Sequence, residues 1–116
     1  MAFVATANAD RAKRFYRDVL GLRLLEDTPF ALVFDAAGTQ LRIQKVQELK
    51  PHQFTALGWK VPDIGSAIVA LRQHGITFER FSFLQQDDRG IWTTPDGSQV
   101  AWFKDPDGNT LSLTQF

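Results

Sequence analysis

The sequence predicts an α+β fold made of two copies of one unit, each with a strand, a helix and three further strands. Three observations support this prediction: two helical patterns that each follow a strand-like segment, alternating patterns elsewhere, and one motif that occurs twice. A chain of 116 residues suits one compact domain. We expect that domain to cover 1–116, with the first unit at 1–46 and the second at 53–116.

The first helix is predicted between Asn8 and Gly21. Asn8 is a favourable N-cap residue, and Gly21 can adopt the left-handed conformation that ends many helices. Apolar residues between them recur at the spacing of one helix face: Ala12, Phe15, Tyr16, Val19 and Leu20. The basic residues of this segment are expected on the solvated side.

The second helix is predicted to follow Pro62 and Asp63 and to end at Gly75. Its apolar stripe consists of Ile64, Ala67, Ile68 and Leu71. His74 lies in the last turn, where we expect it to cap carbonyl groups rather than to bind a ligand.

Most of the remaining chain is predicted as strands, because its apolar and polar residues alternate between turn residues. The strands of the first unit are expected at 3–7, 22–26, 30–34 and 39–45, and those of the second at 53–61, 76–83, 99–104 and 110–115. Residues 35–38 and 105–108 have the composition of hairpin turns, and 84–98 reads as an irregular piece with a further turn at 95–97.

One motif occurs twice, at positions 70 residues apart. VFD-x-x-G-x-x-L-x-I at 33–43 matches FKD-x-x-G-x-x-L-x-L at 103–113. The two helix starts, Asn8 and Asp63, lie only 55 residues apart, which places an insertion of 15 residues around 84–98. The repeat indicates two βαβββ units rather than a longer array.

Composition excludes several classes of function. The 13 basic and 13 acidic residues cancel, so the chain has no general attraction for nucleic acid or anionic membranes. The absence of cysteine excludes disulfides, iron–sulfur clusters and thiolate zinc sites. No apolar run can span a bilayer, and residues 1–10 lack the features of a secretory signal. We therefore expect a cytoplasmic protein that binds a small molecule.

Two segments resemble the vicinal oxygen chelate superfamily, which includes glyoxalase I, bleomycin and fosfomycin resistance proteins, extradiol dioxygenases and methylmalonyl-CoA epimerase. They are FYRDVLGL at 15–22 and FKDPDGNTLSL at 103–113, and the resemblance extends over nearly the whole chain. It implies a glyoxalase-like fold, in which two βαβββ modules curl into an incomplete barrel around a ligand cavity with the helices outside. It also implies a homodimer.

Enzymes of this superfamily hold a divalent metal with four side chains, one from the first and one from the last strand of each module. The corresponding positions here are Met1, Arg42, about Phe54, and Ser112. A lone serine hydroxyl is a poor metal ligand, and the other three side chains are not usable ones. We therefore expect no metal and no other cofactor. A shifted site made of His52 and Gln44 is a weaker alternative.

Strand alternation also predicts which side chains line the expected cavity. Most of them are aromatic or aliphatic, as is usual in small-molecule sites. The predicted ligand-binding residues are Phe30, Leu32, Arg42, His52, Phe54, Trp92, Trp102 and Ser112. Trp59 has the opposite parity and is expected in the core.

Arg42 is the charged residue with the clearest chemical meaning, because a guanidinium inside a barrel is costly unless it is paired. Three roles remain open for it: contact with an anionic ligand group, an internal pair with Glu26 or Glu79, or extension to the rim. Trp92 and Trp102 either stack on a flat or cationic ligand or simply fill the barrel.

These features favour a metal-free small-molecule-binding protein similar to the bleomycin-resistance type, which sequesters its ligand without catalysis. Three alternatives remain. One is a metal-dependent lyase, isomerase or dioxygenase, and another is a metal-free enzyme that uses His52 or Glu79 as acid and base. The third is a non-catalytic regulatory domain that binds a protein partner.

Overall fold

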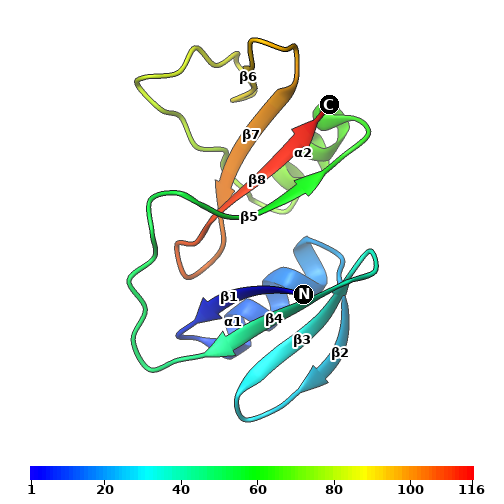
Figure 1. Ribbon diagram of the computed structural model, residues 1–116, viewed down its shortest axis with the longest axis vertical. Coiled ribbons are helices and arrows are strands. Elements are labelled where there is room, and N and C mark those ends of the chain that lie inside the picture. Colours follow the sequence, from blue (N-terminus) through cyan, green and yellow to red (C-terminus); the bar gives the residue numbers. More distant parts are fainter. The chain divides into compact units, whose positions relative to one another are not determined.

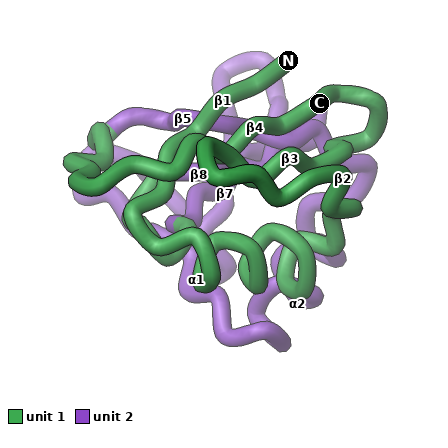
Figure 2. The backbone as a smooth tube through the Cα atoms, turned by 90° about the horizontal axis from the view of Figure 1, so that it is seen from below, with its two compact units in different colours: residues 1–53, 105–109 green, residues 54–104, 110–116 purple.

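Each predicted module forms its own four-stranded mixed sheet with one helical segment, as the computed structural model of residues 1–116 shows (Figure 1). The chain divides into two compact units (Figure 2). Unit 1 comprises 1–53 and 105–109, and unit 2 comprises 54–104 and 110–116. The α+β class and the two βαβββ modules are thus confirmed. The sequence did not predict that loop 105–109, from the second module, would belong to unit 1.

The sheet of unit 1 has the strand order β1-β4-β3-β2, with β1 parallel to β4 and the other neighbours antiparallel (Figure 1). The elements of this unit are β1 (Ala2–Thr6), α1 (Ala9–Arg14), η1 (Phe15–Val19), β2 (Arg23–Asp27), β3 (Ala31–Ala36) and β4 (Thr39–Lys45). Each predicted strand of this unit is confirmed to within two residues.

The first helix begins where the sequence predicts, because the side chain of Asn8 accepts a hydrogen bond from the Arg11 amide at 3.2 Å. It ends near Gly21, which has φ 72°. Its second half, η1, widens into a π-helix in which the Leu20 amide bonds to the carbonyl of Phe15, five residues earlier. The apolar spacing alone did not reveal this widening.

The core of unit 1 lies between the helical segment and one face of the sheet. Leu32 is paired with Ile43, and Phe34 with Leu41, so these four side chains share a face, and all are almost fully buried. The ring of Phe34 lies 6.0 Å from that of Tyr16 in η1, which identifies this face as the helix-covered one.

The sheet of unit 2 has the equivalent order β5-β8-β7-β6, with β5 parallel to β8 (Figure 1). Its elements are β5 (Thr55–Lys60), α2 (Ile64–Gln73), β6 (Trp92–Thr93), β7 (Gln99–Lys104) and β8 (Thr110–Gln115). Trp59 pairs with Leu113 on the helix-covered face, as its parity predicts.

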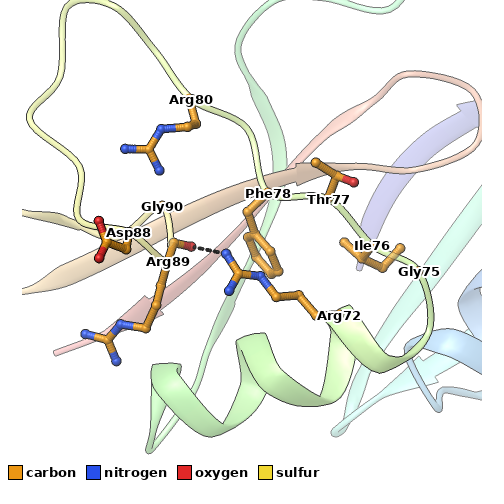
Figure 3. Close-up of a pocket in the computed structure, with 9 residues that line it drawn as sticks. All are labelled: Arg72, Gly75, Ile76, Thr77, Phe78, Arg80, Asp88, Arg89 and Gly90. Carbon is orange, nitrogen blue, oxygen red and sulfur yellow. Dashed lines mark hydrogen bonds between the residues drawn. The ribbon is translucent and has the colours of Figure 1, made fainter.

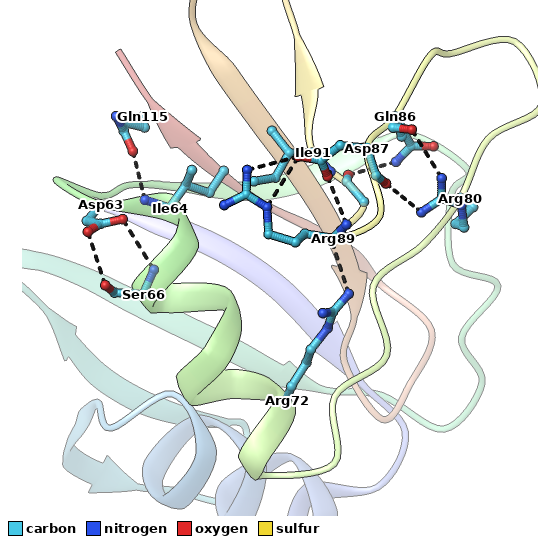
Figure 4. Close-up of polar contacts among 11 residues, drawn as sticks. Asp63, Ile64, Ser66, Arg72, Arg80, Gln86, Asp87, Arg89, Ile91 and Gln115 are labelled. Carbon is cyan, nitrogen blue, oxygen red and sulfur yellow. Dashed lines mark hydrogen bonds and ion pairs between the residues drawn. The ribbon is translucent and has the colours of Figure 1, made fainter.

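Helix α2 begins after Asp63, as predicted, and two side chains cap its first turn. Asp63 accepts a hydrogen bond from the Ser66 amide at 3.2 Å, and Gln115 accepts one from the Ile64 amide at 2.8 Å (Figure 4). The helix ends before Gly75, at φ 84°. His74 is the C-cap residue, with its backbone amide bonded to the carbonyl of Leu71 at 3.0 Å. No helix is long and apolar enough to cross a membrane.

The strand predicted over 76–83 is wrong. This segment makes one backbone hydrogen bond to β7, from the Glu79 amide to the Trp102 carbonyl at 2.8 Å. The side-chain amide of Gln86 supplies hydrogen bonds that a neighbouring strand would otherwise supply to this segment. It accepts one from the Phe81 amide at 2.7 Å and donates to the carbonyls of Glu79 and Gly90. The strand beside β7 is the short β6, within the stretch predicted to be irregular.

Candidate functional site

Each sheet has a second face, opposite its own helix, which we call the helix-free face. In unit 1 the register places Arg42 on it, between Phe3 of β1 and Val33 of β3. Gln44 and Ala31 form the next row. The two residues paired directly with Arg42, Phe3 and Val33, are thus apolar, and polar residues lie further along the face.

Arg42 has no partner in the structure. Its side chain is half-buried and makes neither a hydrogen bond nor an ion pair. Glu79 pairs instead with Lys104, at 3.3 Å. Glu26 lies opposite Val33 but forms no ion pair with Arg42. The internal pair considered from the sequence is therefore not formed, and the guanidinium is available to a ligand.

Leu32 and Phe30 do not share a face with Arg42, which corrects the predicted parity. Leu32 is paired with Ile43 and is fully buried on the helix-covered side. Phe30 precedes β3 opposite Lys45, whose amide bonds to its carbonyl at 2.8 Å, and its side chain is 79% exposed. Residues 31–34 are buried on both faces of the sheet, so alternation carried no information about which face is which.

The helix-free face of unit 2 brings Trp92 and Trp102 together, with ring centres 6.2 Å apart. Phe81 packs edge-on against Trp102 at 5.4 Å, and Phe83 packs on Phe81 at 5.5 Å. We call these four residues the aromatic wall. Phe81 and Phe83 were missed because their segment was predicted to be a regular strand, although three phenylalanines in 78–83 were a visible signal.

Ser112 lies on the same face, between Trp102 of β7 and Gly58 of β5. A Cβ atom at Gly58 would lie only 2.7 Å from the Ser112 hydroxyl oxygen, so glycine is needed there for close packing. Ser112 is buried, with 7% of its surface exposed. Its hydroxyl therefore contributes to the closely packed floor of this face.

Thr55, rather than Phe54, takes the position on this face at the start of β5. The register of β5 against β8 shifts between Thr55 and Leu57, and a bulge of this kind reverses the parity of everything before it. The indole N–H of Trp102 donates to the Thr55 hydroxyl at 3.0 Å, which fixes the orientation of the ring. Phe54 precedes the strand and is 63% exposed, and His52 lies in unit 1 outside any strand.

The side chains do not fit a divalent metal. The strands β1 and β5, with sequences AFVAT and TALGWK, contain no carboxylate and no imidazole. Arg42 supplies a positive charge where a ligand atom would be required, and no three His, Asp or Glu side chains gather anywhere in the chain.

Loop 105–109 is held in unit 1 by a buried carboxylate. Asp105 accepts hydrogen bonds from the Tyr16 hydroxyl at 2.7 Å, from the Asn109 side chain at 2.9 Å, and from the backbone amides of Asp107 and Asn109. The Asn109 side chain also donates to the carbonyl of Ala5 at 2.9 Å. Both quoted family-like segments, at 15–22 and 103–113, thus meet in this network.

Burial raises the pKa of Tyr16 well above its ordinary value, and the adjacent Asp105 carboxylate raises it further. The folded protein therefore keeps this proton at a pH where the unfolded chain has lost it. The resulting stabilisation is complete below about pH 10 and declines as the pH rises from there through the higher pKa of the folded state. We expect the free energy of unfolding to fall between pH 10 and 11.5 by up to about 1.4 kcal/mol per pH unit.

Urea denaturation across this pH range measures the effect. The Tyr16→Phe variant, which cannot ionise at this position, should lose this part of the slope. An equal slope in both proteins would show that other groups control alkaline stability.

A family model matches this chain over residues 1–113, and its description is the Glyoxalase/Bleomycin resistance protein/Dioxygenase superfamily. The chain belongs to this superfamily. No curated protein matches it. Among solved structures, a superfamily member from Sphaerobacter thermophilus is 25% identical, with a TM-score of 0.78 over 99% of this chain and 94% of that one.

Two further solved structures share the fold at lower identity. TnmS3, an antibiotic binding protein from Streptomyces sp. CB03234, is 23% identical, with a TM-score of 0.76 over 99% of this chain and 93% of that one. Lactoylglutathione lyase from Agrobacterium tumefaciens is 18% identical, with a TM-score of 0.75 over 99% and 92% of the two chains. The fold is thus found in both a binding protein and an enzyme, so the side chains must decide between them.

Proposed function

We propose that this chain binds a small organic molecule that carries a flat aromatic part and an anionic group, and that it does so without a metal. Within unit 1 the proposal assigns contact with an anionic group to Arg42, and within unit 2 it assigns contact with an aromatic group to the aromatic wall. The observation that carries it is the unpaired, half-buried guanidinium of Arg42 on the helix-free face.

Two further observations support the binding of a small molecule. The Trp102 ring is already held by its bond to Thr55 and by Phe81, so a stacking ligand does not have to order it. The antibiotic binding protein TnmS3 also has this fold.

Two fluorescent probes of similar shape separate the two contacts. 1-Anilinonaphthalene-8-sulfonate carries an aromatic system and a sulfonate, whereas N-phenyl-1-naphthylamine has the same aromatic system without the charge. We expect the sulfonate to bind the wild-type protein at least about tenfold more tightly, because a charge-assisted hydrogen bond to a guanidinium contributes more than about 1.4 kcal/mol.

The Trp102→Ala substitution should weaken both probes to the same degree, by about 2- to 13-fold, since aromatic stacking contributes about 0.5–1.5 kcal/mol. Trp59→Ala on the helix-covered face is the matched control, and its folded fraction at 25 °C is checked by circular dichroism before titration. The proposal fails if the two probes bind equally well, or if folded Trp59→Ala weakens binding as much as Trp102→Ala does.

A further inference from the structure

Unit 2 contains a second feature that the proposed function does not use, a pocket of about 360 Å³ beside the C-terminal end of α2 (Figure 3). Three arginines line it, Arg72, Arg80 and Arg89, and the one acidic residue among its lining residues is Asp88. The lining therefore carries an excess of two positive charges in a chain whose overall formal charge is zero.

Two of these arginines are held in place without a carboxylate partner. Arg72 donates one hydrogen bond to the carbonyl of Arg89 at 3.2 Å, and Arg80 donates one each to the carbonyls of Asp87 and Gln86, at 2.9 and 3.2 Å (Figure 4). A guanidinium has five N–H donors, so each retains at least three. These bonds fix the direction of the groups without neutralising their charge.

The third arginine is already neutralised. Arg89 forms an ion pair with Asp87, with 3.0 Å between Nη2 and the carboxylate oxygen (Figure 4). Figure 3 shows Arg72 reaching from α2 and Arg80 from the segment on the other side of the pocket. Arg72 and Arg80 are therefore the two residues that can donate hydrogen bonds to one anion from two sides.

The floor of the pocket suits an organic group. Phe78 is 6% exposed, Gly90 is buried, and Ile76 is half-buried. The guanidinium of Arg72 lies 6.0 Å from the centre of the Phe78 ring, which holds it over the apolar floor. Thr77 also lines the pocket.

The nearby helix end does not oppose an anion strongly. The carbonyls of Leu71 and Arg72 at the C-terminus of α2 accept hydrogen bonds from the amides of His74, Gly75 and Ile76. These carbonyls are therefore already satisfied. The negative end of the helix dipole that remains is countered by Arg72 itself.

We propose that this pocket binds a small phosphorylated molecule, with the phosphate held between Arg72 and Arg80 and its organic part on Phe78 and Ile76. The planar, forked guanidinium suits a phosphate better than an ammonium group does. Arg72 and Arg80 supply two positive charges toward a phosphate monoester dianion, and Asp88 on the lining offsets one of them. The volume lies at the small end of the range for small-molecule sites.

The test is a titration of the ¹⁵N-labelled chain, followed by its amide resonances at constant ionic strength. The probes are inorganic phosphate and phenyl phosphate, the second of which adds an aromatic group. We expect saturable shifts at Gly75, Thr77 and Gly90, with phenyl phosphate binding more tightly than inorganic phosphate. Shifts confined to β4, or confined to the aromatic wall, would place the phosphate at the residues of the proposed function and overturn this proposal.

Arg72→Gln should weaken phenyl phosphate at these amides by at least about tenfold. Arg72→Lys keeps the positive charge but loses the forked guanidinium, so it should weaken phenyl phosphate binding by a smaller factor than Arg72→Gln does. If Arg72→Gln does not fold, the affinity of Arg72→Lys is compared with that of the wild type instead. The matched control is Arg11→Gln, because Arg11 and Arg14 line a pocket of similar size, about 370 Å³, on α1.

Unchanged binding in Arg11→Gln supports the assigned pocket. Three results overturn it: no saturation up to about 20 mM of either probe, equal weakening by Arg11→Gln and Arg72→Gln, or equal affinity for the two probes. The last result would show that Phe78 and Ile76 contribute nothing, and that the arginines attract anions in general.

Discussion

An Asp105→Ala substitution is expected to lower the free energy of unfolding by about 3–5 kcal/mol. The carboxylate is 6% exposed and accepts four hydrogen bonds. Two of the donors, the Tyr16 hydroxyl and the Asn109 side chain, belong to buried residues. Removal of the acceptor leaves these donors without Asp105, and an unsatisfied buried donor costs about 1–3 kcal/mol.

The chain offers a matched control in Asp35, which occupies the same place in the first copy of the repeated motif. Asp35 accepts one hydrogen bond, from the Gly38 amide at 2.9 Å, in an exposed turn. We expect Asp35→Ala to cost less than about 1 kcal/mol. Urea denaturation followed by tryptophan fluorescence and circular dichroism measures both variants. Similar losses would contradict a special role for Asp105.

The two copies of the motif therefore have different roles, although their sequences are similar. The first forms a tight turn between β3 and β4, in which Asp35 bonds only within the turn. The second is longer, and Asp107 in it accepts from the Thr6 hydroxyl at 2.6 Å and from the Ala7 amide at 2.9 Å. A sequence repeat predicts the local turn, but it does not predict which distant strand the turn contacts.

Local signals predicted the fold well where they were sufficient. The caps Asn8 and Asp63 and the glycines after the helices marked both helices, because capping depends on a few neighbouring residues. The strand expected at 76–83 failed because the Gln86 side chain supplies the hydrogen bonds that a neighbouring strand would have supplied. Nothing in an alternating pattern distinguishes these two kinds of partner.

The candidate site was predicted less well than the fold, since it depends on which way each side chain points. Trp102 and Arg42 lie on the helix-free faces, as the alternation predicts. The predicted face of Leu32 was wrong because both faces of β3 are buried and alternation there is uninformative. The position predicted for Phe54 is taken by Thr55 because a bulge shifts the register of β5. A one-residue irregularity reverses every assignment beyond it, and it has no clear sequence signature.

An Arg42→Met substitution is expected to change stability and binding in opposite directions. The guanidinium is half-buried without a partner, so its replacement by an apolar side chain of similar length should raise the free energy of unfolding by about 1 kcal/mol. The same change should weaken 1-anilinonaphthalene-8-sulfonate by about 30-fold, since it removes a charge-assisted hydrogen bond to the sulfonate. The uncharged probe N-phenyl-1-naphthylamine should bind as before, within about twofold.

Urea denaturation and fluorescence titration of the same samples measure both effects. Arg14→Met, at an exposed position of α1, is the matched control and should leave stability within about 0.5 kcal/mol and both probes unchanged. Replacement of a residue that is retained for structure lowers the stability of the protein, whereas replacement of a residue that is retained for a ligand can raise it. A loss of stability in Arg42→Met together with unchanged sulfonate binding would therefore identify Arg42 as a structural residue, and would remove the observation that carries the proposed function.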